Sequence, residues 1–237
     1  MIKFSIIVPC FNELESLPFL LEKFLKYLNR DDIEIILVDN GSYDGSKEKI
    51  PALIKNYFFA KSIRIEKNIG YGNGILEGIV SSTGEYVGWT HADLQTDPKD
   101  ILEGIKIIEK FESNKNSKEI FVKGNRNNRH YIDNFFTKGM SFFVSIIFGK
   151  FLWDINAQPN ILHRKMIERW PNPPLDFSFD LFIFVQAVKS KCFIKRFNVS
   201  FPKRIFGKSK WNFNLYSKFK FSLRTIRYAL FLKKSIR

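Results

Sequence analysis

The segment His91-Ala92-Asp93-Leu94-Gln95 brings an imidazole, a carboxylate and an amide close together in the chain. Alternate residues of an extended segment point the same way, so His91, Asp93 and Gln95 can converge on one ion. Oxygen-rich sites of this kind suit Mg²⁺ or Mn²⁺, with substrate phosphates completing the coordination. The same combination also occurs in ordinary loops, so the segment alone does not establish a metal site.

Two further polar pairs, Asn12-Glu13 and Asp39-Asn40, each follow a short apolar run that predicts a buried strand. Strand patterns alternate with helical patterns over the first ~125 residues, which implies a mostly parallel, three-layer α/β sheet. Ligands of such sheets bind beyond the carboxyl ends of the strands. The polar pairs and Asp93 are therefore predicted to line one site. The expected strands are 4–8, 33–38, 63–66, 86–89 and 120–123. The expected helices are 17–28, 71–81 and 98–112, together with a helix after Asp44 that Pro51 shortens or kinks.

The second part of the chain is less regular. Residues 134–153 are apolar almost all round, which fits either a buried helix or a helix lying in a membrane interface between flanking basic residues. A helix over 178–189 and a strand over 193–201 follow. We expect one domain over residues 1–205 and a basic, aromatic, amphipathic tail over residues 206–237.

Charge is distributed very unevenly. The net charge is +14, yet residues 181–237 hold 15 Lys and Arg and no acid, while the rest of the chain sets 23 bases against 24 acids. Such a block usually meets a polyanion: nucleic acid, an anionic membrane leaflet or a phosphorylated substrate. A solvated tail without a specific partner is the alternative.

Composition narrows the class of protein. With 237 residues, 45% of them hydrophobic, the chain can bury a core, which excludes disorder for most of it. Two cysteines are too few for a disulfide framework, so a reducing compartment is expected. Neither a signal peptide nor an apolar run near 18 residues is visible. We expect a cytoplasmic protein, peripheral on the cytoplasmic face of a membrane.

Five motifs occur in a fixed order: FSIIVPCFNE, VDNGSYDGS, NIGYGNGILEGI, TGEYVGWTHADLQTDP and KGNR. This ordered set resembles the family 2 glycosyltransferases, and most closely the branch of dolichyl-phosphate and polyprenyl-phosphate sugar synthases. The segments DINAQPNILHRK, DFSFDL and RIFGKSK extend the likeness to roughly residues 3–211. The resemblance implies the GT-A fold, a Rossmann-like α/β/α arrangement, and an inverting hexosyltransferase activity.

The resemblance also implies roles for single residues. Nucleotide or donor binding falls to Pro9, Phe11, Glu13, Asp39, Ala92, Asp93, Arg126, Arg204 and Lys210, with Asn73 of the GYGNG loop as a further candidate. Arg129 and Lys138 are candidates for the acceptor phosphate, and Asp93, Gln95 and His91 for the metal. Pro9 can equally end a strand, and Asp39 can cap a turn.

One position departs from the family pattern: His91 stands where the first acid of the D-x-D motif is expected. Losing a carboxylate weakens the attraction for a hard cation. The Mg²⁺ or Mn²⁺ is then bound more weakly or held mainly by the diphosphate. Alternatively, His91 contacts only the sugar or the nucleotide.

The implied reaction moves a sugar, with inversion, from a UDP- or GDP-sugar to a polyprenyl phosphate or related lipid-linked acceptor. A hydroxyl acceptor needs a general base, for which Asp180 is the first candidate and Asp176 the second; either acid can instead cap a helix. A lipid phosphate needs no strong base, and Asp180 then positions the sugar. The alternatives are transfer to a growing cell-surface glycan and a non-catalytic relative. Nucleic-acid binding is disfavoured because it leaves the motifs of residues 5–97 unexplained.

Overall fold

A single mixed sheet forms the centre of the protein. The computed structural model describes residues 1–114, 118–127, 131–202, 204–206 and 215–235, and within them the sheet has seven strands in the order β3-β2-β1-β4-β6-β5-β7. All neighbouring strands are parallel except β6, which runs antiparallel to both β4 and β5. The strands are β1 (Phe4–Cys10), β2 (Ile33–Asn40), β3 (Ala60–Ile65), β4 (Tyr86–Trp89), β5 (Ile120–Asn127), β6 (Asn160–His163) and β7 (Phe193–Ser200).

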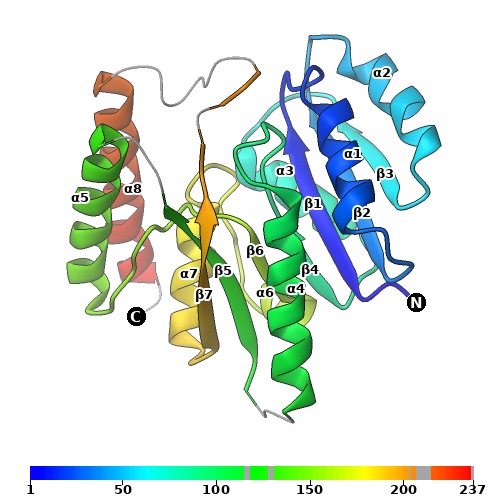
Figure 1. Ribbon diagram of the computed structural model, residues 1–237. Coiled ribbons are helices and arrows are strands. Elements are labelled where there is room, and N and C mark those ends of the chain that lie inside the picture. The colour runs from blue at the N-terminus through cyan, green and yellow to red at the C-terminus, as the bar shows by residue number, and fades with distance from the viewer. Residues whose placement is uncertain (115–117, 128–130, 203, 207–214, 236–237) are drawn as a thin grey trace.

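Helices cover both faces of this sheet, as Figure 1 shows. Helices α1 and α4 pack with β1 and β2 residues on one face, and α3, α6 and α7 pack on the other. The predicted three-layer α/β architecture is therefore confirmed. The helices are α1 (Leu17–Tyr27), α2 (Ser46–Leu53), the 3₁₀ turn η1 (Ile54–Asn56), α3 (Tyr71–Val80), α4 (Pro98–Ser113), α5 (Tyr131–Phe148), α6 (Arg164–Glu168), α7 (Phe179–Lys189) and α8 (Leu215–Ser235).

The strand β6 was not predicted. Its four residues, NILH, give too short a run for a periodicity argument, and an antiparallel insertion breaks the alternation of strands and helices. The other predicted strands are present within a few residues, and Pro51 lies inside α2 as expected.

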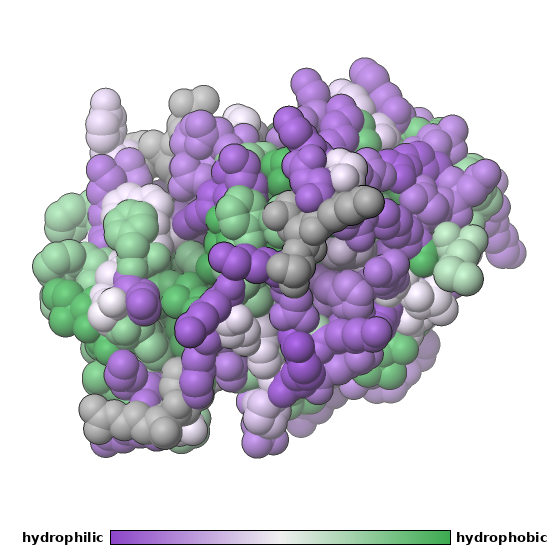
Figure 2. Space-filling view, turned by 90° about the horizontal axis from the view of Figure 1, so that it is seen from below, coloured by the Kyte–Doolittle hydropathy of each residue, from purple (hydrophilic) through white to green (hydrophobic). Residues whose placement is uncertain are grey.

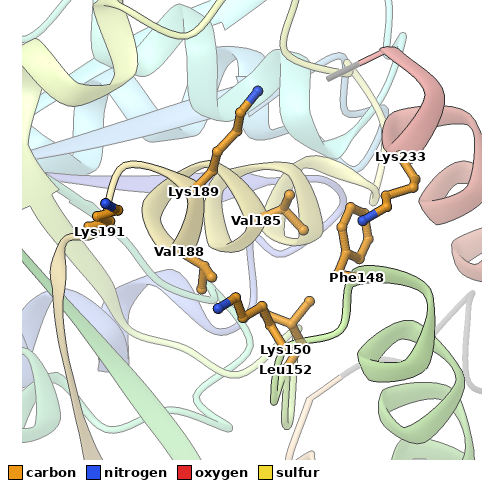
Figure 3. A pocket seen from close by; sticks show the side chains of 8 residues that line it. All are labelled: Phe148, Lys150, Leu152, Val185, Val188, Lys189, Lys191 and Lys233. Carbon is orange, nitrogen blue, oxygen red and sulfur yellow. The ribbon is translucent and has the colours of Figure 1, made fainter. Parts of the chain in front are cut away.

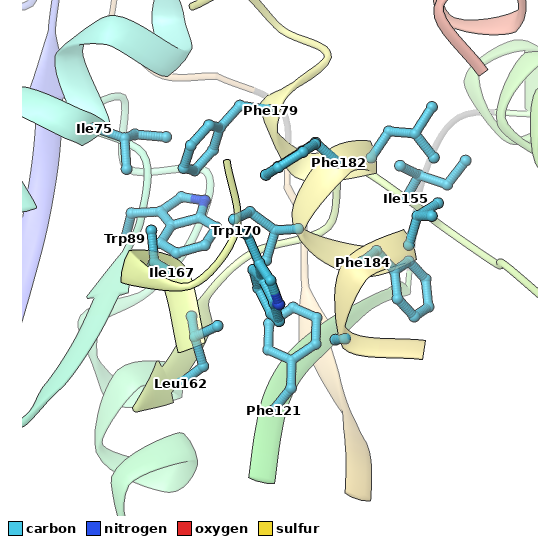
Figure 4. Close-up of a cluster of buried hydrophobic side chains, with 14 of the residues drawn as sticks. Ile75, Trp89, Phe121, Ile155, Leu162, Ile167, Trp170, Phe179, Phe182 and Phe184 are labelled. Carbon is cyan, nitrogen blue, oxygen red and sulfur yellow. The ribbon is translucent and has the colours of Figure 1, made fainter. Parts of the chain in front are cut away.

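Aromatic side chains fill the layer between the sheet and α7 (Figure 4). The ring of Trp89 meets that of Phe179 at 5.3 Å between centroids, and Phe121 meets Phe184 at 6.2 Å. Every residue of α7 from Phe179 to Ala187 is buried, so this helix is fixed by packing all round. The carboxyl end of β4 and the first turn of α7 are thereby held against each other.

Helices α5 and α8 form an additional pair beside α7. Lys218 and Asp133 form an ion pair of 2.6 Å near the first turns, and the ammonium of Lys233 lies 5.7 Å from the centroid of Phe148 near the last turns. The two helices therefore run parallel (Figure 1). Because α8 buries Thr225, Ala229 and Leu232 against the core, most of the region predicted as a tail is a packed helix.

The outward face of α5 is apolar and exposed. Its buried positions are Thr137, Met140, Ser141 and Val144, so the interpretation of this segment as a wholly buried helix is wrong. Figure 2 shows the apolar surface gathered on the side of the molecule where α5 and α8 lie. The exposed apolar residues are Tyr131, Ile132, Phe135, Phe142, Phe143 and Ile146 of α5, and Leu215, Tyr216, Phe219, Leu230 and Phe231 of α8. We call this surface the α5–α8 face. Among the described residues, none of the helices is both long enough and apolar enough to cross a bilayer.

Candidate active site

Three loops meet beyond the carboxyl ends of β1, β2 and β4, where the sequence predicts the site. In the parallel register Cys10 lies opposite Asp39, so the polar pairs that follow these strands start at the same level. The backbone N–H of Asn12 donates to the Ser42 hydroxyl at 2.9 Å. The hydroxyl of Ser16 donates to the carbonyl of Ala92 at 2.8 Å, which ties the first loop to the loop after β4.

Arg204 connects two acids of this site. Its guanidinium donates to the carboxylate of Glu13 and lies 3.7 Å from that of Asp93. Burial raises the pKa of Glu13 to about 6, although Arg204 opposes the shift. Residues far apart in the sequence, predicted separately to face the donor, therefore form one charged cluster, which we call the Glu13–Arg204–Asp93 cluster.

The loop of the candidate metal ligands is bent rather than extended. Residues 92–96 form bends, and Leu94 has a φ of 61°, so the alternation argument for His91, Asp93 and Gln95 does not apply. The side-chain amide of Gln95 donates to the carbonyl of Pro202 at 2.9 Å. The described residues include no cluster of three His, Cys, Asp or Glu that would hold a metal by itself.

The donor set nevertheless suits a cation that a diphosphate helps to hold. The Nε2 atom of His91 is buried and has no hydrogen-bond partner among the described residues. Burial lowers the pKa of His91, which favours the neutral imidazole that can ligate a metal. Asp93 supplies a carboxylate, and the amide oxygen of Gln95 is a further hard ligand. A weak site completed by phosphate oxygens fits these residues.

Asp39 occupies a buried position at the end of β2 and is 2% exposed. Its carboxylate accepts a hydrogen bond from the backbone N–H of Ser42 at 2.9 Å and one from the Arg64 guanidinium. The contact with Ser42 is the turn cap that the sequence suggested for Asp39, and the contact with Arg64 is additional. Nearby, the ring of Phe11 meets the ring of Tyr43 edge-on at 5.8 Å, which leaves Phe11 beside this turn.

The glycine-rich start of α3 lies directly under the loop that precedes α7. A Cβ added to Gly72 would lie 2.3 Å from the carbonyl oxygen of Pro174, and one added to Gly74 would lie 3.4 Å from Pro9. Asn73 is buried, and its backbone N–H donates to the carbonyl of Leu175 at 2.9 Å. These glycines therefore permit close backbone packing, as expected of a segment that turns the chain into a helix.

Asp180 lies at the base of this region and is 3% exposed. Its carboxylate accepts hydrogen bonds from the indole N–H of Trp89 at 2.8 Å and from the Tyr71 hydroxyl at 3.4 Å. The Nδ2 of Asn160 approaches it at 3.4 Å, and Oδ1 of the same Asn160 accepts a hydrogen bond from the buried ammonium of Lys123 at 2.8 Å. Burial raises the pKa of Asp180 and lowers that of Lys123 to about 7.

Asp176 is more accessible, with 43% of its side chain exposed. It accepts a hydrogen bond from the backbone N–H of Ser178 at 2.8 Å, so it caps the turn before α7, and it lies 3.8 Å from the guanidinium of Arg224 on α8. The neighbouring Phe177 stacks on Tyr71 with centroids 4.8 Å apart and planes within 2°. This stack links the loop before α7 to the hydroxyl that reaches Asp180.

Arg126 has a carboxylate partner that sequence reasoning missed. Its Nε donates to Asp154 at 3.0 Å, its backbone N–H donates to the same carboxylate at 2.8 Å, and only 8% of its side chain is exposed. The ring of Phe201 lies 5.1 Å from the guanidinium. Asp154 is the first residue of the DINAQPN segment. Its ion pair with Arg126 depends on the path of the loop before β6, which the sequence does not predict.

Of the remaining predicted residues, the structure describes only Lys138, which does not join this cluster. Lys138 is exposed on α5. Arg129 and Lys210 lie outside the described residues. Residues that the sequence analysis did not single out but that shape the site are Tyr71, Trp89, Lys123, Asp154, Gln158, Asn160 and Phe177.

Comparison with known proteins agrees with this fold. The pattern of Glycosyl transferase family 2 matches residues 5–182, so the chain belongs to that family. It is 27% identical over 205 residues to the dolichyl-phosphate beta-glucosyltransferase of Dictyostelium discoideum, covering 78% of this chain and 62% of the relative. It is 29% identical over 177 residues to the undecaprenyl-phosphate 4-deoxy-4-formamido-L-arabinose transferase of Serratia proteamaculans, covering 72% of this chain and 52% of the relative. The chain thus spans between half and two thirds of the length of these two relatives.

Solved structures share the fold at low sequence identity. One is glucosyl-3-phosphoglycerate synthase of Mycobacterium tuberculosis in complex with Mn²⁺, UDP and glucosyl-3-phosphoglycerate, with a TM-score of 0.71, 13% identity and coverage of 98% of this chain and 79% of that one. The same enzyme with Mg²⁺ and UDP superposes with a TM-score of 0.72 at 13% identity, over 98% of this chain and 79% of that one. The GT-A-like fold expected from the sequence is therefore confirmed.

Proposed function

We propose that this protein transfers a sugar, with inversion, from a nucleoside diphosphate sugar to a polyprenyl phosphate at a membrane surface. The two curated relatives, whose names specify dolichyl phosphate and undecaprenyl phosphate, support this acceptor class. UDP in the related structures favours a uridine donor over a guanosine one. The proposed enzyme is thus a family 2 glycosyltransferase whose acceptor is embedded in a membrane.

The observation that carries the proposal is the position of the α5–α8 face. Both helices begin toward the end of the sheet where β1 finishes and run toward the opposite end (Figure 1). Helix α8 contacts the loop before α7, where the ring of Phe221 lies 5.8 Å from that of Phe177 and the guanidinium of Arg224 lies 3.8 Å from the carboxylate of Asp176. A helix pair with apolar residues facing outward and lysines along its borders suits the interface of an anionic bilayer. Each Lys or Arg near such a surface contributes about 1 kcal/mol to attachment. A bilayer-bound acceptor would thus lie next to the donor site.

The residues of the site suit diphosphate chemistry. Asp93, with His91 and Gln95, would hold Mg²⁺ or Mn²⁺, and such an ion neutralises charge on a departing diphosphate. Arg204 supplies fixed positive charge at the same place. Glu13, Asp39 and Asn73 would contact the nucleotide from the β1, β2 and α3 loops.

The acceptor decides what Asp180 must do. A lipid phosphate is already anionic, so it needs orientation rather than a strong base. The burial of Asp180 and its bond to Trp89 suit a residue that positions the sugar through its neighbours. A glycan hydroxyl acceptor would instead require an accessible base, for which Asp176 has the greater exposure.

Calorimetric titration of UDP and GDP, each with Mn²⁺ and with EDTA, tests the donor half of the proposal. We expect Mn²⁺-dependent binding of UDP. Asp93→Ala should weaken this binding about tenfold, which corresponds to about 1.4 kcal/mol, because the variant lacks the carboxylate that would hold the ion. Failure of both nucleotides to bind would favour a non-catalytic relative. Incubation of the UDP-sugar with polyprenyl phosphate and, separately, with a glycan acceptor then tests the acceptor. Product on the glycan alone would refute the lipid-phosphate proposal.

A further inference from the structure

The two carboxylate oxygens of the buried Asp180 are held by different elements. The indole N–H of Trp89 donates to Oδ1 at 2.8 Å, and the Nδ2 of Asn160 approaches the same oxygen at 3.4 Å. The hydroxyl of Tyr71 donates to Oδ2 at 3.4 Å. Within the described part of the chain, no second hydrogen-bond donor reaches Oδ2. Since a buried polar atom is stabilised by its hydrogen bonds, the orientation of this carboxylate depends on Tyr71.

The direction of the Tyr71 hydroxyl is set by its other partner. The side-chain amide of Gln158, which is 1% exposed, donates to the Tyr71 oxygen. A tyrosine hydroxyl has a single proton, so an oxygen that accepts from Gln158 can direct its own proton to Asp180. The distance of 3.4 Å to Asp180 is at the long end of the hydrogen-bond range. A small displacement of the Tyr71 ring would therefore break the bond.

The ring of Tyr71 is held by a stack with Phe177, in the loop before α7. Their centroids are 4.8 Å apart and their planes lie within 2° of each other. Such stacking restricts the plane of a ring and adds to the stabilisation that comes from burial. The same loop contacts the start of α3 through the hydrogen bond from the backbone N–H of Asn73 to the carbonyl of Leu175, at 2.9 Å. A ring contact and a backbone bond thus hold Phe177 and Tyr71 together.

Helix α8 supplies further contacts to Phe177. The ring of Phe221 meets that of Phe177 at 5.8 Å with planes at 71°, and the guanidinium carbon of Arg224 lies 5.9 Å from the Phe177 centroid. The same guanidinium lies 3.8 Å from the carboxylate of Asp176. Phe221 and Arg224 are three residues apart, so they share one face of the helix. This face of α8 therefore contacts two consecutive residues of the loop before α7.

Helix α8 is itself fixed along its length. Near its first turn, Lys218 pairs with Asp133 of α5 at 2.6 Å, and further along Ala229 is fully buried. Near its last turn, Lys233 lies beside Phe148, at a cavity of about 290 Å³ that the ends of α5, α7 and α8 line (Figure 3). A helix with contacts at both ends and in between can act as a firm support for the loop that it touches.

We propose that Tyr71 and Phe177 are positioning residues for Asp180, and that α8 belongs to the structure of the active site. Tyr71 sets the orientation of the carboxylate through Oδ2, and Phe177 sets the position of the Tyr71 ring. Phe221 and Arg224 in turn hold Phe177. The inference rests on the proposed function, in which Asp180 positions the donor sugar. Helix α8 then combines an outward apolar surface with an inward support for the donor site.

The indole N–H of Trp89 is a direct probe of this arrangement, because it donates to the same carboxylate. The chain has four tryptophans, so a ¹⁵N–¹H NMR spectrum of the indoles contains four signals to assign. Tyr71→Phe keeps the stack but removes the donor to Oδ2, and the Trp89 signal should move. Phe177→Leu removes the stack and should move this signal in the same direction, whereas Phe177→Tyr should restore it. This measurement needs neither nucleotide nor acceptor.

Turnover with UDP-glucose and undecaprenyl phosphate tests whether the position of Asp180 affects sugar transfer. Tyr71→Phe and Phe177→Leu should each lower kcat about tenfold or more, because a small misplacement of a group at the reacting centre slows the reaction strongly. The KM for UDP-glucose should change by about twofold or less, since the contacts to the nucleotide are retained.

Two matched controls separate positioning from general destabilisation. Phe193→Leu removes a ring from the stack with Phe111, 5.1 Å away, at the start of β7 and should leave kcat and the Trp89 signal unchanged. On α8, Arg224→Gln should lower kcat, whereas Arg227→Gln removes the same charge from an exposed position and should not.

Three results would overturn the inference. A Trp89 signal that stays in place in both Tyr71→Phe and Phe177→Leu would mean that neither residue holds Asp180. A parent-like kcat in both variants would mean that this support does not matter for transfer. An equal loss in Phe193→Leu would mean that the effect is one of stability alone. Absence of turnover in the parent protein would instead contradict the proposed function, and the NMR signals would then decide the inference.

Discussion

The indole N–H of Trp89, at the end of β4, donates a 2.8 Å hydrogen bond to the carboxylate of Asp180 in the first turn of α7. This bond joins the sheet to a helix across the floor of the candidate site. Asn160 links Asp180 to Lys123: its Nδ2 donates to the carboxylate of Asp180, and its Oδ1 accepts a hydrogen bond from the ammonium of Lys123. The network is buried, so a change in its charge should affect the stability of the fold.

Asp180→Asn is expected to lower the free energy of unfolding by about 1–3 kcal/mol, because the buried Lys123 then loses its compensating negative charge. Adding Lys123→Met should recover part of this loss, since removing both charged partners avoids an isolated buried charge. Denaturant unfolding of the single and double variants measures both effects. Equal stability of Asp180→Asn and the parent protein would contradict the proposed network.

Arg204 is predicted to affect the metal and the nucleotide in opposite directions. Arg204→Gln removes the cation between Glu13 and Asp93, so Mn²⁺ alone should bind more tightly to the freed carboxylates. The affinity for UDP with Mn²⁺ should fall about tenfold, because a charge-assisted hydrogen bond to the diphosphate is lost. Calorimetry of each ligand tests the pair of signs. Arg227→Gln, at an exposed position of α8, is the matched control and should change neither affinity.

The exposed face of α5 is predicted to contribute to membrane binding rather than to folding. Phe135→Ser/Phe142→Ser/Ile146→Ser should greatly weaken sedimentation with anionic vesicles, since a large apolar side chain contributes about 1.5–3 kcal/mol when it leaves water. The thermal unfolding temperature should change little, because these side chains are exposed in the folded protein. Phe58→Ser removes an aromatic side chain that is 71% exposed elsewhere and should leave sedimentation intact. Unchanged vesicle binding of the triple variant would exclude this face from attachment.

The position of the site was predictable because strand order converts short sequence patterns into spatial neighbours. Glu13 and Asp93 follow β1 and β4, and Asp39 lies at the end of β2. These three strands are adjacent and parallel, so the strand-end rule placed the three acids at one edge of the sheet before any side-chain contact was known. The pairing of Arg126 with Asp154 was not predictable, because it depends on the path of a loop before the unpredicted β6. Helix α8 escaped prediction for a related reason. It is stabilised by packing against α5 and the core rather than by a clear apolar period of its own.

The pH dependence of stability should reveal Glu34. Burial alone would raise the pKa of this carboxyl, but hydrogen bonds from Lys61, Thr83 and Ser5 outweigh it and lower the pKa to about 2. The pKa is therefore lower in the folded state than the value of about 4.3 in the unfolded chain. Stability from Glu34 is present above about pH 5 and is lost as the pH falls toward 2.

Glu34→Gln is expected to reduce the unfolding free energy at pH 7 by about 1–3 kcal/mol. The ammonium of Lys61 is exposed, so solvent screens its ion pair with Glu34 and the effect should fall in the lower part of this range. The difference from the parent protein should shrink between pH 5 and pH 2. Chemical denaturation across this range measures it, with the exposed Glu48→Gln as the control. A difference that stays constant with pH would show that the ionised carboxylate contributes nothing.

Two helical glycines give a matched test of the packing around the site. In α3, a Cβ on Gly72 would lie 2.3 Å from the carbonyl oxygen of Pro174 and 2.9 Å from that of Asp176, so Gly72→Ala must displace the loop before α7. In α5, a Cβ on Gly139 would meet nothing within 4 Å. Gly139→Ala should therefore stabilise the protein by about 0.5–1 kcal/mol through helix propensity alone.

Gly72→Ala is expected to destabilise the protein by about 1–3 kcal/mol, as overpacking against backbone does. It should also weaken UDP binding, because the displaced loop carries the contact between Leu175 and Asn73 at the start of α3. Thermal unfolding and nucleotide calorimetry of both alanine variants provide the measurements. If Gly72→Ala proved as stable as Gly139→Ala and bound UDP normally, the loop before α7 could not be a rigid wall of the donor site.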